Sequence, residues 1–516
     1  MTERKRIAVN IVATYGRSLY ALVIGLFCGR WALMALGEVD YGLIGVVGGL
    51  TAFISFFNGI MAGGVGRFYA ISVGESKNDP VRGLEKCREW FTTAVMIHTI
   101  LPVALMVIGY PAGEWAVRNF LTIPPDRVES CVWVWRFTCI SCFVGMASVP
   151  YNAMYNAKQE IAELTVYSFV TTTLNFCFLY YAIRNPGDWL ARYAGWGCFL
   201  SVAPSLTIAL RSVFKYKECR FRRAYARCWG NIKNMMSYSG WLFIGSLGDL
   251  FSAQGMNVLV NKYFGPRVNA AQNVSNTLSG QCTTLSGSIL GAFWPAIMNA
   301  YGARDFVHMR KMAYLVCKLA PMFIMLFAIP LALEIDEVLL LWLKKPPEFA
   351  AGLCVLALIV LVGDRTTHGF AIAMHSTGEI AKYQIVVGGV YLFALPLAWV
   401  FFANGFSVYA LGYAMLISRG ACAFMRIIMA RKKTGLSLRY WIVNVLVPIL
   451  AVATFTIAMG LLPRMFMCAS FGRVCITSAV CVSTMAVSSW FFAMNFQERS
   501  FVCGKMKLLL RRIVCA

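Results

Sequence analysis

Charged side chains are scarce in this sequence, and acidic ones are the scarcest. Only 14% of the 516 residues are Asp, Glu, Lys or Arg, whereas 59% are hydrophobic and the mean hydropathy is +0.65. A soluble chain of this length needs more polar surface than that, so the composition excludes a soluble multidomain protein. It indicates a polytopic membrane protein.

The sequence also lacks the clusters that metal, redox or nucleotide chemistry requires. Its 18 cysteines have no regular spacing, which argues against a secreted disulfide framework. The lone pair Cys139 and Cys142 lies inside an apolar run, and a zinc or redox site would need a second pair or a loop setting. The glycine-rich segment from Gly63 to Gly66 lacks the strand and phosphate-loop context of a nucleotide site. We therefore expect no metal or organic cofactor and no ATPase activity.

Long apolar runs dominate the chain. A helix of about 20 apolar residues crosses the hydrocarbon core of a membrane, and the sequence contains fourteen runs of this kind. These runs are 7–35, 42–72, 91–110, 131–155, 161–183, 191–211, 237–262, 271–298, 312–333, 350–375, 384–403, 407–429, 441–462 and 474–495. Most of the 47 lysines and arginines fall in loops on the side of the N-terminus, which predicts that both termini are cytoplasmic. The first run has no convincing small-residue cleavage site, so we expect an uncleaved anchor.

The chain has a formal net charge of +24, and most of its basic residues lie in loops. The longest one, residues 211–233, separates the first six spans from the rest. Contact with lipid phosphates and the orientation signal explain such a loop without a nucleic-acid partner. We predict an N-terminal six-helix bundle (1–212), a basic linker (213–236), a second six-helix bundle (237–430), and two further helices followed by a basic amphipathic tail (431–516).

The first two spans resemble spans seven and eight when the sequence is laid on itself without gaps. One offset places Gly37, Val46, Leu50, Gly59 and Gly74 on Gly265, Val274, Leu278, Gly287 and Gly302. Because both copies begin on the inner side, the two repeats would be parallel and related by an axis along the membrane normal, with a ligand path between them. This organisation is typical of a transporter.

Cations outnumber acids inside the predicted spans. The cations are Arg17, Arg30, Arg67, Arg136, Lys318, Arg365, Arg419 and Arg426, whereas the acids are Asp249 and Asp364. A midspan arginine costs about 3 kcal/mol on insertion scales, so an anionic ligand is the simplest missing partner. The planar fork of arginine suits phosphate, because it can hold two phosphate oxygens at once.

Depth in the membrane separates these cations. Arg17, Arg365 and Arg419 lie nearest the midplane, and we expect them to converge on one water-accessible cavity, with Arg136 towards the outer face. The alternative for each arginine is to snorkel, or to pair with an acid or a carbonyl group. That alternative is favoured for Arg30, Arg67 and Arg426.

Asp249 and Asp364 are the candidates for a coupling ion, Na⁺ or a proton. Asp249 lies midway in the seventh span, with further polar residues in the next two turns. An ion pair with Arg17 or another span arginine is an equal alternative for Asp249. The span histidines could relay protons, although isolated histidines in helices more often serve as hydrogen-bonded packing residues.

Several motifs carry a resemblance to a known family. They are Asn10-x3-Thr14-x2-Arg17, Leu36-Gly-x2-Asp40-Tyr-Gly42, Tyr263-Phe-Gly-Pro-x-Val-Asn-Ala-Ala271, Trp294-Pro295, Tyr301-x-Ala-Arg-Asp305 and Leu339-x2-Trp-Leu-Lys-x-Pro-Pro-Glu348. With these motifs the chain resembles the polysaccharide transporter branch of the multidrug/oligosaccharidyl-lipid/polysaccharide flippase superfamily. It departs from related sequences at Trp294-Pro-Ala296, where they commonly have Asn-Pro-Gln.

The resemblance implies a fold, an activity and partners. It implies an all-α membrane protein of two six-helix bundles around a central cavity, with two added C-terminal helices. The implied activity is the export of oligosaccharides linked to polyprenyl pyrophosphate across the bacterial inner membrane. The implied partners are this lipid-linked oligosaccharide, membrane lipids and the glycan polymerase machinery. Two alternatives remain: a cation-coupled drug antiporter of the same fold, which would favour an acidic cavity, and a membrane glycosyltransferase or polymerase. The short outer loops disfavour the second, so we expect no enzyme activity.

Overall fold

The computed structural model describes residues 3–49, 52–121, 123–185, 187–225 and 228–494, together with Arg499. These residues form helices joined by short loops, and no strand occurs among them. The predicted all-α class is therefore confirmed. The basic tail beyond residue 494, apart from Arg499, lies outside the described residues.

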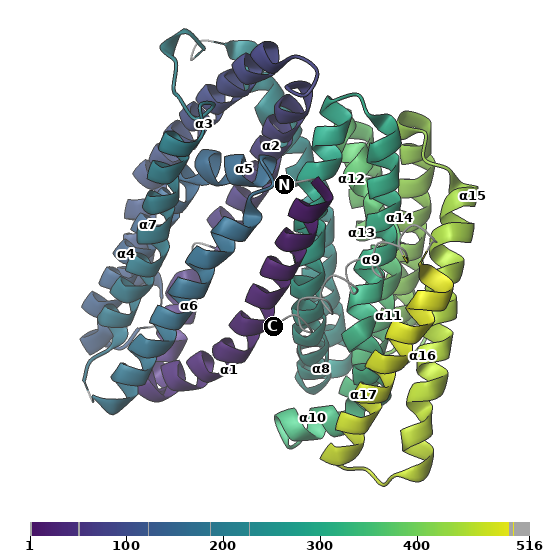
Figure 1. Ribbon diagram of the computed structural model, residues 1–516. Coiled ribbons are helices and arrows are strands. Elements are labelled where there is room, and N and C mark those ends of the chain that lie inside the picture. The colour runs from purple at the N-terminus through teal and green to yellow at the C-terminus, as the bar shows by residue number, and fades with distance from the viewer. Residues whose placement is uncertain are drawn as a thin grey trace, which may run out of the picture. The chain divides into compact units, whose positions relative to one another are not determined.

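Seventeen α-helices make up the described fold (Figure 1). They are α1 (Glu3–Gly49), α2 (Ala52–Glu75), α3 (Pro80–Trp115), α4 (Val128–Ala147), α5 (Val149–Ala157), α6 (Ile161–Arg184), α7 (Leu190–Lys215), α8 (Trp229–Gly302), α9 (Phe306–Leu333), α10 (Ile335–Leu343), α11 (Ala350–Arg365), α12 (His368–Thr377), α13 (Ala381–Ala403), α14 (Ala410–Thr434), α15 (Leu438–Trp441), α16 (Val447–Phe466) and α17 (Phe471–Ser488). Short π or 3-10 segments lie between several of them.

Ten described helices are long and apolar enough to cross a membrane. The number becomes eleven if α11 and α12, which are bent by 44° relative to each other, form one span. The chain is thus a multi-pass membrane protein, but the predicted count of fourteen is not confirmed. Two of the predicted spans, 237–262 and 271–298, lie in α8, where two helices meet at the Gly265 kink, and neither is among the ten.

The chain divides into two compact units. Unit 1 comprises 1–244, 291–309 and 376–381, and unit 2 comprises the remaining segments, 245–290, 310–375 and 382–516. In unit 1, α1 packs along α6, α4 along α7, and α2 against α3 and α5. In unit 2, α11 packs on α14 and α16 on α17. The predicted domain bounds follow the order of the chain and stay a prediction.

The internal repeat is visible in the backbone. Within α1 the helix is interrupted at Gly37, with φ 76° and ψ 170°, and within α8 it is interrupted at Gly265, with φ 81° and ψ 179°. A positive φ with extended ψ is accessible to glycine and strained for other residues. Gly37 and Gly265 are one of the pairs that the offset aligns, so the predicted repeat pairs two positions with the same unusual conformation.

A second pair of repeat glycines meets inside unit 1. A Cβ atom on Gly74 would lie 2.1 Å from the carbonyl oxygen of Asn299, and one on Gly302 would lie 2.2 Å from that of Ile71. The offset that pairs Gly74 with Gly302 also pairs Ile71 with Asn299, so each repeat presents the same two positions to the other, as in an isologous contact. Both glycines lie in the last turn of their helices. Like ends of equivalent helices therefore meet, which is consistent with the predicted parallel repeat.

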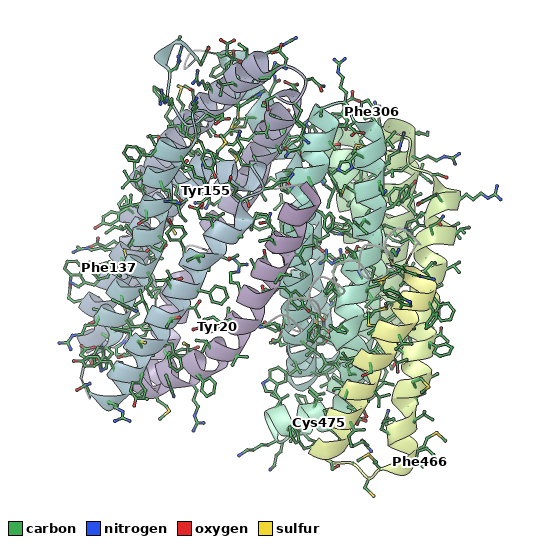
Figure 2. All side chains as sticks on the ribbon, viewed as in Figure 1. Tyr20, Phe137, Tyr155, Phe306, Phe466 and Cys475 are labelled. Carbon is green, nitrogen blue, oxygen red and sulfur yellow. The ribbon has the colours of Figure 1, made fainter. Side chains whose placement is uncertain are left out.

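The two C-terminal helices are tied to unit 2 by a buried ion pair. Glu334, just before α10, is fully buried, and its Oε2 accepts a hydrogen bond from Arg473 Nη2 of α17 at 2.8 Å. The other carboxylate oxygen accepts from Thr477 at 2.9 Å. Phe466 and Cys475, near the turn that joins α16 to α17, mark this end of unit 2 in Figure 2. The prediction of two C-terminal helices is confirmed.

Candidate functional site

A group of polar side chains lies inside unit 2, and we call it the arginine cluster. Its members are Asp249 of α8, Asp364 and Arg365 of α11, His368 of α12, Tyr391 of α13, and Arg419 and Arg426 of α14. Arg419 and Arg426 lie about two helical turns apart, so they share one face of α14. The bend between α11 and α12 sets Asp364, Arg365 and His368 close together.

The deepest part of the cluster is the ion pair between Asp364 and Arg426. Their side chains are only 10% and 4% exposed, and Arg426 Nη1 donates to Asp364 Oδ1 at 2.8 Å. The same nitrogen also approaches the Asp364 carbonyl oxygen at 3.3 Å and Thr367 Oγ1 at 3.4 Å, while Nη2 donates to the hydroxyl of Tyr391. This pair is almost fully buried. Breaking such a pair costs about 3–5 kcal/mol.

The second ion pair, between Asp249 and Arg419, is much more open. Arg419 Nη2 donates to Asp249 Oδ1, and the two side chains are 20% and 50% exposed, Arg419 being the less exposed. The Arg419 guanidinium also lies over the Tyr391 ring, 4.0 Å from its centroid. Of the two roles considered for Asp249, a coupling-ion site and an ion pair with a span arginine, the structure shows the ion pair, and its partner is Arg419.

Of the three arginines of the cluster, Arg365 lies farthest from a carboxylate. Its Nη1 lies 3.2 Å from His368 Nε2 and 3.9 Å from Asp364 Oδ2, and its side chain is 12% exposed. Its Nε atom is buried and has no hydrogen-bond partner among the described residues. The cluster thus holds three guanidinium groups against two carboxylates. It can accept one more negative charge.

The predicted site residues of unit 1 lie in different surroundings. Arg17 is partly buried on α1 and makes no ion pair or hydrogen bond with a described residue. Arg136 pairs with Glu114 at 3.3 Å and lies 5.1 Å from the centroid of the Trp133 ring. Arg17 belongs to unit 1 whereas Arg365 and Arg419 belong to unit 2, so their convergence on one cavity stays a prediction.

Two of the cations expected to snorkel or to pair with protein groups, Arg30 and Arg67, lie outside the arginine cluster. Arg30 is exposed. Arg67 is buried, donates to the carbonyl oxygen of Ser376 at 3.1 Å, and lies over the rings of Phe68 and Tyr238 at 5.0 and 4.7 Å. These contacts are the carbonyl and packing interactions that make a buried guanidinium tolerable.

Two polar residues of the sequence motifs hold local structure. Asn10 of α1 donates to the Gln159 carbonyl oxygen at 2.9 Å and accepts from the Ala162 amide at 3.1 Å, which fixes the start of α6. Asp40, three residues after the interruption of α1, lies 3.3 Å from Arg127 Nε. Burial raises the pKa of the Asp40 carboxyl, although Arg127 acts in the opposite direction.

Tyr391 is the residue of the cluster that sequence reasoning missed. It supports Arg419 through its ring and Arg426 through its hydroxyl. A tyrosine in an apolar run carries no signal of this role, because its partners lie on another helix. Among the described residues, no group of three or more His, Cys, Asp or Glu could hold a metal ion.

Solved structures of similar fold are transporters. A MOP superfamily transporter from Pyrococcus furiosus, described as having a binding pocket of reversed polarity, matches with a TM-score of 0.67 and 16% identity over 84% of this chain and 96% of that one. A MATE point mutant matches with a TM-score of 0.68 and 15% identity over 84% and 97%. An outward-facing multidrug resistance MATE transporter of the MOP superfamily matches with a TM-score of 0.66 and 15% identity over 84% and 96%. No family model and no curated protein matches the sequence. The chain has the fold of MATE transporters of the MOP superfamily.

Proposed function

We propose that this protein moves an oligosaccharide linked to polyprenyl pyrophosphate across the bacterial inner membrane by alternating access, for the export of lipopolysaccharide, capsule or exopolysaccharide. The protein acts as a transporter and not as an enzyme. Its fold is one that transporters use, and its apolar helices place it in a membrane.

The observation that carries this proposal is the excess of arginine at membrane depth. The arginine cluster has one more guanidinium than it has carboxylates. In unit 1, Arg17 has no acidic partner among the described residues. A midspan arginine costs about 3 kcal/mol unless water, a partner or a ligand compensates. A pyrophosphate supplies the missing negative charge and matches the fork of the guanidinium group.

The sign of the interior charge separates this function from drug antiport, which the fold accommodates equally well. A cavity for cationic drugs favours acidic residues, because like charges repel the ligand. Here both span carboxylates are already held by arginines. Coupling to Na⁺ or a proton through Asp249 or Asp364 would require one of these pairs to open, and the more exposed Asp249 is the better candidate.

Arg17 provides the test of this function. Arg17→Ala should abolish glycan export in cells while the melting temperature stays near that of the wild type. Arg17→Lys should restore export only in part, since lysine cannot make the bidentate phosphate contact. Arg30→Ala is the matched control, because it removes the same charge from an exposed position of the same helix.

Two outcomes would contradict the role of Arg17. A stable Arg17→Ala protein that exports normally removes Arg17 from the site. A large loss of thermal stability in Arg17→Ala, with the remaining folded protein exporting normally, assigns Arg17 to folding.

A further inference from the structure

The two ion pairs of the arginine cluster differ in a way that points to a second role for Asp249. Asp364 and Arg426 are 10% and 4% exposed, whereas the Asp249 side chain is 50% exposed and that of Arg419 is 20% exposed. Separating the enclosed pair would leave a bare charge in the protein interior. Separating the open pair would leave Asp249 in contact with solvent, which can hydrate its charge.

Half of the Asp249 side chain is accessible on the surface of unit 2. Asp249 lies midway along a predicted membrane span, and a carboxylate at that depth is rarely turned towards hydrocarbon. On this ground its exposed half is assigned to a polar, water-accessible space that a solute can enter. The Arg419 guanidinium, to which it is bound, lies next to that space.

Arg419 has a second support that does not depend on Asp249. Its guanidinium lies 4.0 Å from the centroid of the Tyr391 ring, and the hydroxyl of Tyr391 is held by Arg426. A cation over an aromatic face gains stabilisation without using its N–H donors. The ring thus keeps the guanidinium in place when the carboxylate leaves, with its donors free for another anion.

We propose that Asp249 is an internal substitute for the phosphate of the substrate: it holds Arg419 in the ligand-free protein and is displaced when a pyrophosphate group binds that arginine. This proposal rests on the proposed function and adds a carboxylate that neutralises Arg419 when no ligand is bound. It also makes Asp249 a determinant of affinity, because the ligand must compete with it. Substrate release is then favoured by the return of Asp249 to Arg419.

Binding of inorganic pyrophosphate to the purified full-length protein in a neutral detergent tests the exchange. Asp249→Asn removes the competing charge and should tighten the dissociation constant by about fivefold or more. Asp249→Ser should act in the same direction. Asp336→Asn is the matched control: it removes one negative charge from an exposed position of the same unit, on α10, and should leave binding within about twofold of the wild type.

The double variant locates the effect. In an Arg419→Ala background, Asp249→Asn should no longer change pyrophosphate binding, because the exchange has lost its arginine. Unchanged or weaker binding in both Asp249 variants would overturn the proposal. Equal tightening with and without Arg419, or in Asp336→Asn, would also overturn it, since the effect would then be one of net charge.

Two further comparisons identify the source of the phosphate group and separate a failure of the exchange from a failure of the proposed transport function. Farnesyl pyrophosphate that shows the same dependence on Asp249 and binds more tightly than inorganic pyrophosphate identifies the lipid-linked group as the ligand. Exchange in both assays without any glycan export in cells would refute the flippase function and leave the exchange standing. Export that requires Arg17, with no effect of Asp249→Asn on binding, would refute the exchange alone.

Discussion

The contact between the two repeats is tight enough to give a quantitative prediction for Gly74→Ala. Real Cβ atoms essentially never come within 3.0 Å of another heavy atom, yet a Cβ at this position would lie 2.1 Å from the Asn299 carbonyl oxygen. The obstacle is backbone, so the two helix ends would have to separate by about 1 Å in a closely packed region. Forcing extra atoms into such packing costs about 1–3 kcal/mol.

The matched control lies on the same helix. A Cβ on Gly66 would have no heavy atom within 4 Å, so Gly66→Ala should show only the gain in helix propensity, about 1 kcal/mol. Gly74 lies in the last turn of α2, where this gain is smaller, so the difference in the free energy of unfolding between Gly66→Ala and Gly74→Ala is set mainly by the packing cost. It should be about 1–3 kcal/mol, with Gly74→Ala the less stable.

Thermal unfolding of the purified variants measures the difference. The two-fold relation adds a further requirement: Gly302→Ala, which meets the Ile71 carbonyl oxygen at 2.2 Å, should destabilise by a similar amount. A Gly74→Ala protein as stable as Gly66→Ala would refute the close contact. Strong destabilisation by Gly74→Ala with none by Gly302→Ala would refute its two-fold character.

Two further predictions concern unit 2 and the topology. Arg426→Ala should lower the free energy of unfolding by about 3–5 kcal/mol because Asp364 is left buried without its partner, and thermal unfolding that matches Arg30→Ala would contradict this. A cysteine introduced at the exposed Arg222 should react with an impermeant thiol reagent only after the inner membrane is opened, because the bias of basic residues places the 211–233 loop in the cytoplasm. Labelling at Arg222 from the periplasmic side of intact cells would overturn the predicted orientation.

Glycine is where the sequence predicted the structure best. The repeat offset was visible because a positive φ at Gly37 and Gly265, and a backbone contact at Gly74 and Gly302, exclude almost every other residue. The number of spans was harder to predict. Hydropathy shows where a segment is apolar, but it does not show how two such segments join, as they do at the Gly265 kink of α8.

The pairing inside the arginine cluster could not be predicted from the sequence. Composition revealed too many span cations for two acids, and it identified Asp249 and Asp364 as their possible partners. The choice of Arg419 for Asp249, 170 residues away, depends on how α8 and α14 pack. The same packing decides which carboxylate is enclosed and which is open to water, a difference that no local pattern encodes.

Reconstitution in liposomes tests the transport function most directly. A fluorescent oligosaccharide linked to a short polyprenyl pyrophosphate is placed in both leaflets, and an impermeant reductant added outside quenches the label that it can reach. The proposed function predicts that the wild-type protein makes the inner-leaflet label accessible to quenching and that Arg17→Ala does not. Quenching confined to the outer leaflet, as in protein-free liposomes, together with transport of a cationic dye by the same preparation, would contradict it.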